Sequence, residues 1–229
     1  MNTLDIGNAN LAATRSGKSG RRDWLIVVSI LLAMLLVVLA AVAYAFGPAC
    51  IAYWQYQPRE GDVVFQSLPY SRLVRAIEGA TRSPYSHCGV VAKRDGRWVV
   101  YEAYDGVSAT PLREFLFRGR NQGFAVYRLK EDRQQYVPAM LECVQSYLGR
   151  PYDVRYRFDD EAIYCSELIF KAYRTATGGE ELGTVVKFGD LNWKPFEETV
   201  QHYEPGPVPL DREMITPKDL ALAPQLELV

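Results

Sequence analysis

The segment CSELIFKAY, residues 165–173, decides how the rest of this 229-residue chain is interpreted. It has the pattern of an amphipathic helix that begins at Cys165, and the positive end of a helix favours a thiolate. A strand pattern, YSHCGVV at residues 85–91, carries His87. An imidazole can take the proton of a thiol and return it to a leaving amine. These segments predict Cys165 as a nucleophile and His87 as its base, because the other histidine, His202, adjoins a proline-rich stretch.

A hairpin supplies a third candidate residue. Asp95-Gly96 lies between two apolar runs, which is the strongest short-range signal for a β-hairpin. With this turn at the centre, Gly89 lies opposite Glu102, and Glu102 becomes a diagonal neighbour of His87, roughly 7 Å away between Cα atoms. A carboxylate at that position fixes the tautomer of the imidazole and supports the imidazolium, so we predict Glu102 as the orienting residue.

Residues 24–46 form a long apolar stretch, WLIVVSILLAMLLVVLAAVAYAF, without a charged residue. At about 1.5 Å per residue, a helix of this length covers roughly 34 Å, enough for a hydrocarbon core of about 30 Å. A cleaved signal peptide has a shorter apolar region of about 7–15 residues. Lipoprotein-type cleavage before Cys50 is disfavoured by Pro48. We therefore predict an uncleaved transmembrane helix.

Basic residues gather at one end of this stretch. Arg15, Lys18, Arg21 and Arg22 precede it closely, whereas the first basic residue after it is Arg59. The positive-inside rule then predicts a cytoplasmic N-terminus and a periplasmic or otherwise extracytoplasmic remainder in the cell membrane. The expected parts are a disordered leader (1–23), a transmembrane helix (24–46), a juxtamembrane linker (47–58) and a globular catalytic domain (59–229).

Overall composition limits the partners and cofactors. The 26 Lys and Arg residues balance 27 Asp and Glu residues, so charge gives no argument for a nucleic-acid partner. A domain of this size buries a core without bridges, so Cys88 and Cys143 are expected to be small core residues rather than a disulfide. The acidic run 159–161 lacks a histidine or thiol at ligand spacing, and we predict neither a metal nor a cofactor.

The region after residue 60 alternates between strand and helix patterns. Strands are expected at 61–66, 87–92, 98–103 and 124–129, and helices at 71–78, 110–117, 133–148 and from 165 onward. Strands with helices packed outside one face are typical of an α+β fold.

Six motifs follow one another through this region: GDVVFQ (61–66), SPYSHCG (83–89), YEA (101–103), YLGRPYD (147–153), YCSEL (164–168) and TPKDL (216–220). In this order they resemble the circularly permuted papain-like amidases of the YiiX/YaeF type, relatives of the NlpC cell-wall peptidases. The resemblance implies a permuted papain-like fold with an antiparallel sheet, in which the histidine hairpin precedes the cysteine helix. It also implies Cys165 as nucleophile, His87 as base and Glu102 as the third, polar member.

The same resemblance adds two further residues. Tyr152 corresponds to a tyrosine beside the oxyanion site of the relatives, and with the backbone N–H of Cys165 it is the candidate for stabilising the tetrahedral oxyanion. Cys88, directly after the histidine, departs from the family pattern. A second thiol at this position is either a redox partner of the site or, in our expectation, a residue that faces the core.

These expectations combine into a membrane-anchored, extracytoplasmic cysteine hydrolase that cleaves an amide through a thioester on Cys165. The implied substrates are cell-envelope peptides or N-acyl amides. A lipid acyltransferase or thioesterase like the lecithin:retinol acyltransferase branch is the alternative enzyme, and the identity of the acyl group on Cys165 separates the two. A catalytically silent envelope-binding module is the alternative of another class, against which the presence of both Cys165 and His87 argues.

Overall fold

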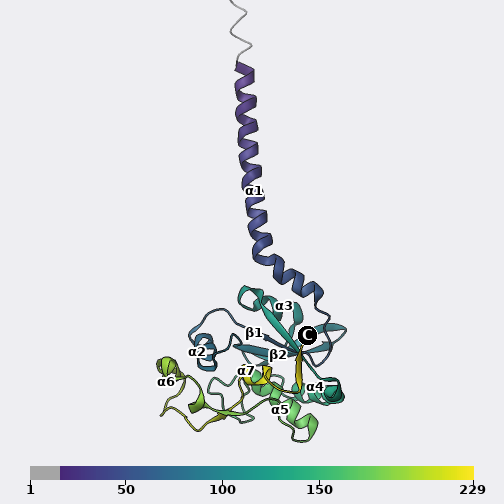
Figure 1. Ribbon diagram of the computed structural model, residues 1–229, viewed down its shortest axis with the longest axis vertical. Coiled ribbons are helices and arrows are strands. Elements are labelled where there is room, and N and C mark those ends of the chain that lie inside the picture. The colour runs from purple at the N-terminus through teal and green to yellow at the C-terminus, as the bar shows by residue number, and fades with distance from the viewer. Residues whose placement is uncertain (1–15) are drawn as a thin grey trace, which may run out of the picture. The chain divides into compact units, whose positions relative to one another are not determined.

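The structure is a computed structural model that describes residues 16–229, so residues 1–15 of the expected leader lie outside the described residues. The chain divides into two compact units, one ending at Cys50 and one covering Ile51–Val229 (Figure 1). The second unit contains all of the candidate site residues.

Helix α1 (Ser16–Gln55) contains the apolar stretch. From Arg22 to Tyr44 this helix is long and apolar enough to cross a membrane. Ser29, the polar residue within the stretch, donates its hydroxyl to the carbonyl of Leu25 at 2.8 Å. The hydroxyl is thus satisfied without water, as a hydrocarbon environment requires.

Helix α1 is longer at both ends than the sequence predicted. It includes residues 16–23, expected as leader, and residues 47–55, expected as linker. A proline inside a helix removes one backbone hydrogen bond but keeps φ in the helical range, so Pro48 does not by itself end the helix. Beyond the helix, the buried carboxylate of Asp62 accepts hydrogen bonds from Arg128 Nε at 2.6 Å and from the hydroxyl of Tyr56 at 2.8 Å.

One antiparallel sheet organises the second unit, in the strand order β4-β3-β2-β1-β5-β8. Its strands are β1 (Val63–Gln66), β2 (His87–Arg94), β3 (Arg97–Ala103), β4 (Val107–Pro111), β5 (Phe124–Leu129) and β8 (Leu226–Leu228). A second, two-stranded sheet consists of β6 (Val186–Lys187) and β7 (Glu213–Met214). The mixture of helices with an antiparallel sheet confirms the predicted α+β class.

Helices cover this sheet and connect its strands. They are α2 (Arg72–Thr81), α3 (Leu112–Arg118), α4 (Val137–Ser146), α5 (Cys165–Thr177), α6 (Glu197–Tyr203) and α7 (Pro217–Ala221), with 3-10 turns η1 (Arg120–Gln122), η2 (Glu131–Tyr136), η3 (Phe188–Asp190) and η4 (Lys194–Phe196). Helix α2 begins where Ser71 Oγ accepts the N–H of Val74 at 3.1 Å, which is the usual role of a serine N-cap.

Two predicted helices have different limits in the structure. The helix expected at 110–117 begins only at Leu112, because residues 107–111 pair with β3 as the edge strand β4. The helix expected at 133–148 is divided into η2 and α4. Pro138 fits this division, since it lies in the first turn of α4, where proline is favoured.

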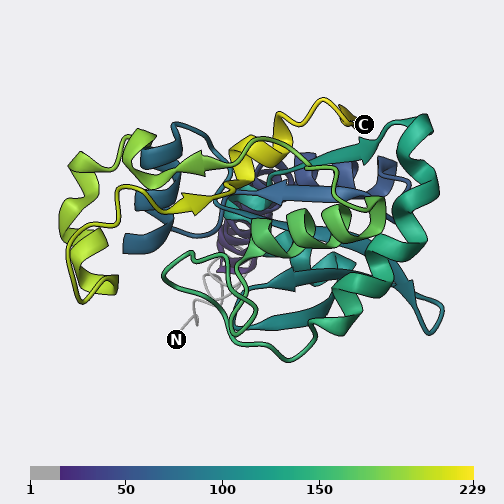
Figure 2. The ribbon, with the colours of Figure 1, turned by 90° about the horizontal axis from the view of Figure 1, so that it is seen from below.

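The sheet separates two apolar cores, and helices α3 and α5 lie on opposite sides of it (Figure 1). Alternate residues of β2 face alternate sides. Cys88 and Val90 belong to the core beneath α5, whereas Val91 packs in the core with Phe115 of α3. Figure 2 shows α5, in green, lying over the sheet. The first residues of β2 and α5, His87 and Cys165, are therefore brought together at one end of the sheet.

Candidate active site

The start of helix α5 is fixed from several directions. Tyr164 precedes Cys165 in an extended conformation, and its N–H donates to Glu167 Oε2 at 3.2 Å. The N–H of Ile215 donates to the hydroxyl of Tyr164 at 3.1 Å, and the hydroxyl of Ser166 donates to the carbonyl of Ile215 at 2.8 Å. The residues before and after Cys165 are thus each hydrogen-bonded to Ile215, which holds the backbone of Cys165 in place.

The predicted hairpin register is confirmed. Gly89 pairs with Glu102 and Arg94 with Arg97. Asp95 (φ 50°) and Gly96 (φ 76°) both adopt the left-handed conformation that a tight hairpin turn requires.

This register brings the side chain of His87 against that of Glu102. Nε2 of His87 and Oε2 of Glu102 lie 2.5 Å apart. Both side chains are buried. Glu102 also accepts hydrogen bonds from Thr110 Oγ1 at 2.5 Å and from Arg118 Nη2. The predicted orienting carboxylate therefore has the imidazole, a hydroxyl and a guanidinium as its three partners.

Aromatic rings hold the imidazole of His87 from two sides. Its ring centre lies 5.6 Å from that of Phe115 and 5.7 Å from that of Tyr104. The guanidinium of Arg118 in turn lies over the ring of Tyr104, 4.4 Å from the ring centre. The His87 ring is consequently packed as well as hydrogen-bonded, so its orientation is restricted.

The side chains of Cys165 and His87 interact, and each shifts the pKa of the other. His87 uses Nε2 for Glu102, which leaves Nδ1 as the ring nitrogen that faces the thiol. Burial alone lowers the pKa of His87, but its hydrogen bonds to Cys165 and Glu102 raise that pKa to about 9. Burial alone raises the pKa of Glu102, but His87 and Arg118 lower it to about 2.

The pKa of Cys165 is lowered well below that of an ordinary thiol. Hydrogen bonds from the side chain of Cys88 and from His87 outweigh the opposing effect of burial, and the backbone N–H of Cys88 also donates to the sulfur. A thiolate next to an imidazolium is the reactive form of a cysteine nucleophile. The electrostatics thus favour the ion pair between Cys165 and His87.

The structure confirms only part of the prediction for Cys88. It is buried in the core on the face of β2 opposite to His87, as expected. That face is also the one covered by α5, so Cys88 contacts Cys165 directly. Strand alternation in the sequence predicts that His87 and Cys88 face opposite sides of the sheet. It does not indicate which side α5 and Cys165 cover.

Tyr152 is also close to the nucleophile. Its ring is half-buried and interacts electrostatically with Cys165, and its hydroxyl lies 3.2 Å from the hydroxyl of Tyr156. Burial raises the pKa of Tyr152 well above that of an ordinary phenol. The hydroxyl is therefore protonated at neutral pH and available as a hydrogen-bond donor.

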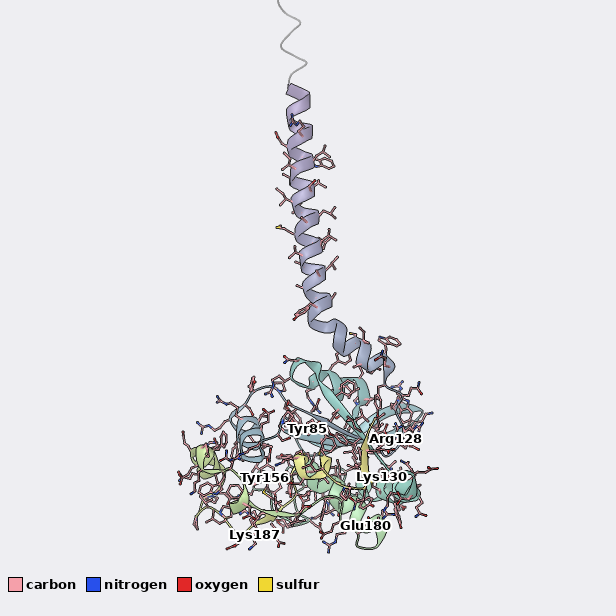
Figure 3. The ribbon with its side chains drawn as sticks, viewed as in Figure 1. Tyr85, Arg128, Lys130, Tyr156, Glu180 and Lys187 are labelled. Atoms are coloured by element: carbon pink, nitrogen blue, oxygen red, sulfur yellow. The ribbon has the colours of Figure 1, made fainter. Side chains whose placement is uncertain are left out.

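Tyr156, labelled in Figure 3, is a site residue that the sequence did not reveal. Its φ of 55° is unusual for a bulky residue. The conformation is held by Asp153, whose carboxylate accepts the N–H groups of Arg155 at 2.8 Å and Arg157 at 2.5 Å. The turn at residues 153–157 thereby fixes Tyr156 next to Tyr152.

A cavity of about 100 Å³ adjoins this part of the site. Tyr156 and Ser166, the residue after Cys165, contribute to its wall. The rest of the lining is mainly apolar and includes Leu73, Ile77, Phe188, Leu191, Trp193 and Met214. The cavity is suited to a small apolar group.

All four predicted site residues lie together, and the structure adds Thr110, Arg118 and Tyr156. Thr110 was within reach of prediction, because β4 continues the alternation of β3 and sets Thr110 on the face of Glu102. No sequence pattern indicates Arg118 or Tyr156. Arg118 is positioned by helix α3, on the side of the sheet away from α5, and Tyr156 by a turn that the Asp153 side chain stabilises.

Comparisons with known proteins identify the family. Residues 57–229 match the family described as permuted papain-like amidase enzyme, YaeF/YiiX, C92 family. The protein YiiX of Escherichia coli strain K12 is 32% identical over 181 residues, which cover 76% of this chain and 87% of YiiX. The crystal structure of the metalloprotein yiiX from Escherichia coli O157:H7 is similar with a TM-score of 0.70 and 30% identity, over 76% of this chain and 97% of that one. The chain therefore belongs to the permuted papain-like amidase family of cysteine amidases and peptidases.

Proposed function

We propose that the protein is a membrane-anchored cysteine hydrolase that cleaves an amide bond through a thioester on Cys165. The observation that carries the proposal is the continuous chain of contacts from Cys165 through His87 to Glu102, at the start of helix α5. This arrangement contains a nucleophile, a proton carrier and a carboxylate that holds the carrier.

In the first half of the reaction, the Cys165 thiolate attacks the amide carbonyl. The hydroxyl of Tyr152 and the N–H of Cys165 donate hydrogen bonds to the oxyanion that forms. The His87 imidazolium then gives its proton to the leaving amine, the C–N bond breaks, and the acyl group remains on Cys165 as a thioester. Glu102 stabilises the positive charge on His87 before this step and keeps the ring in position.

In the second half, a water molecule replaces the amine. Neutral His87 removes a proton from the water, and the resulting nucleophile attacks the thioester carbonyl. The same two donors stabilise the second oxyanion. The C–S bond breaks, the carboxylic acid leaves, and the Cys165–His87 ion pair is restored.

The apolar cavity beside Tyr156 supports one substrate class over the other. An apolar cavity of about 150 Å³ can hold benzene, so the cavity here, about 100 Å³, suits a short or branched aliphatic group. An N-acyl amide presents such a group next to its scissile bond. The proposal accordingly favours N-acyl amides over polar envelope peptides, and transfer of the same acyl group to a lipid alcohol is the second candidate.

Membrane anchoring is part of the proposal. Helix α1 is apolar over Arg22–Tyr44, and the basic residues before it support a cytoplasmic N-terminus with the catalytic unit outside. Reporter enzymes fused after Val229 test this topology. Activity of a reporter that works only outside the cytoplasm is expected, and activity of a purely cytoplasmic reporter would reverse the orientation.

A metal has no part in the proposed reaction. The solved relative is described as a metalloprotein. In this chain, no group of three or more His, Cys, Asp and Glu side chains among the described residues is arranged to hold a metal ion. The site residues among those described do not fit a metal ion.

Intact-mass spectrometry of the full-length protein in detergent tests the proposed chemistry. After incubation with N-acyl amides or muropeptides, the acyl group should add to Cys165, and C165A should acquire nothing. C143A is the matched control, since this half-buried thiol lies outside the site, and it should be acylated like the wild type. Release of the acyl group only after addition of a lipid alcohol would indicate the transferase. No acylation by either class, together with a Cys165 that alkylates no faster than Cys50, would favour a silent binding module.

A further inference from the structure

Cys88 and Cys165 are two thiols in contact beneath the site. Cys165 is the first residue of α5 and Cys88 the second residue of β2; these two elements pack against each other, and each of the two thiols shifts the pKa of the other. Both are free thiols, both belong to the same core cluster, and their exposed fractions are 0% for Cys88 and 2% for Cys165. The proposed amide cleavage needs only Cys165 as nucleophile, which leaves the Cys88 sulfur without a covalent role.

We propose that Cys88 and Cys165 form an oxidative modification site, at which a peroxide joins the two sulfurs in a disulfide and silences the nucleophile. The inference rests on the proposed function, because it requires Cys165 to be a reactive thiolate. A domain outside the cytoplasm meets oxidants that the cytosol removes. A disulfide protects the nucleophile there, since it returns to two thiols on reduction, whereas an unprotected thiolate is oxidised irreversibly.

The chemistry takes place in two balanced steps. The Cys165 thiolate attacks one oxygen of hydrogen peroxide, so that an S–O bond forms, the O–O bond breaks, and hydroxide leaves and becomes water on taking a proton. The Cys88 sulfur then attacks the sulfenic sulfur of Cys165, an S–S bond forms, and the oxygen leaves as water with the Cys88 proton. The two thiols lose two electrons together, and the peroxide is reduced to two waters.

The surroundings give the two sulfurs different roles. The hydrogen bonds from Cys88 and His87 lower the pKa of Cys165, whereas burial and the neighbouring Cys165 thiolate raise the pKa of Cys88. Cys165 is therefore the thiolate that meets peroxide first, and Cys88 is the protonated partner that resolves the sulfenic acid. Packing of β2 against α5 within one core cluster keeps the resolving sulfur in place before oxidation.

The test treats the full-length protein in detergent with hydrogen peroxide, then unfolds it and alkylates the remaining thiols. In the wild type, two of the four cysteines should escape alkylation, and peptide mapping should find Cys88 linked to Cys165. A thiol reductant should restore both thiols and the reactivity of Cys165. C88S and C88A should form no such link, and their Cys165 should proceed to sulfinic acid that the reductant does not reverse. C143S is the matched control and should behave like the wild type.

The outcomes separate this inference from the proposed function. Wild-type Cys165 that alkylates rapidly but is oxidised to sulfinic acid without linking to Cys88 would overturn the inference and leave the amidase proposal intact. A Cys165 that reacts with neither peroxide nor alkylating reagent would overturn both. Thermal unfolding of C88S and C88A, compared with the wild type, verifies that the variants are folded when their oxidation is measured.

Discussion

At the scale of single residues, the site depends on a buried carboxylate. Glu102 is fully buried and accepts hydrogen bonds from His87, Thr110 and Arg118. Without these partners its burial would favour the neutral acid. Ionised Glu102 instead raises the pKa of His87, which in turn stabilises the thiolate of Cys165. The reactivity of the nucleophile thus begins with a carboxylate on the neighbouring strand.

Removing Arg118 should destabilise the fold in a pH-dependent way. Glu102 has a folded-state pKa of about 2, against about 4.3 when unfolded. Because the pKa of Glu102 is lower in the folded state, its ionised form contributes stability at a pH above the unfolded-state pKa. This stability is lost as the pH falls through the folded-state pKa. R118M raises the folded pKa of Glu102, so it should lower the free energy of unfolding by about 3 kcal/mol near neutral pH and by less at about pH 3.

Denaturant unfolding at the two pH values measures this difference. R113M is the matched control, because Arg113 is exposed on the same helix, and it should change the free energy of unfolding by less than about 0.5 kcal/mol. An equal loss of stability from R118M at both pH values would show that Glu102 is not the group through which Arg118 acts.

His87 should determine the pH at which Cys165 reacts. With the His87 imidazolium beside it, Cys165 is already a thiolate at a pH below about 8.5, the pKa of an ordinary thiol. The ion pair persists until the pH reaches the pKa of His87, about 9, where the imidazolium loses its proton. H87A should slow alkylation of Cys165 by iodoacetamide at least about tenfold at about pH 6, the effect of one pKa unit. At about pH 9.5 the change should be small. H202A is the control and should leave both rates unchanged, whereas equal slowing by H87A at both pH values would contradict the ion pair.

At the scale of elements, a hairpin and a helix start position the site. The β2–β3 hairpin places Glu102 beside His87 by register, and the hydrogen bonds of Tyr164 and Ser166 to Ile215 fix the start of α5. The hairpin register depends on local turn chemistry, whereas the position of α5 depends on a segment that lies far away in the sequence.

Gly89 should be essential to the hairpin. A Cβ at this position would meet Val100 Cγ1 at 2.4 Å and the carbonyl oxygen of Tyr101 at 2.9 Å. Because the backbone oxygen cannot move aside without breaking the sheet, G89A should cost about 2–3 kcal/mol of stability and displace Glu102, its partner in the register. Thermal unfolding measures the cost. G206A, where a Cβ meets nothing within 4 Å, should be nearly neutral, and an equally stable G89A would show that the hairpin tolerates a side chain here.

At the scale of the whole molecule, the chain joins an apolar helix to a compact catalytic unit. The helix needs no partner to satisfy its backbone, and so it suits a lipid environment. The compact unit has its own sheet and its own cores. Anchoring and catalysis are therefore expected to respond to different substitutions.

Charges placed in the middle of α1 should release the protein from membranes. An arginine near the centre of a spanning helix costs about 2.5–3.5 kcal/mol of insertion free energy. The double variant L35R/L36R should shift the protein from the alkali-resistant membrane fraction to the soluble or aggregated fraction. L210R is the control, since Leu210 is exposed in the catalytic unit, and it should stay membrane-bound. Retention of L35R/L36R in the membrane fraction would contradict anchoring by α1.

The sequence by itself determined the features that depend on neighbours along the chain. Asp95-Gly96 set the hairpin, the hairpin set Glu102 beside His87, and the apolar run at 24–46 set the long helix, because turn dihedrals, strand alternation and hydropathy are local properties. The order of the motifs also indicated the permuted fold.

Only the tertiary structure decided which parts meet across the sheet. Packing of α5 on the face of Cys88 put two thiols in contact, packing of α3 on the other face brought Arg118 to Glu102, and a carboxylate-held turn placed Tyr156 beside the apolar cavity. Alternation along a strand shows that two residues face opposite sides, but not which element covers each side. That assignment is made by the burial of apolar surface over the whole chain, so no local pattern contains it.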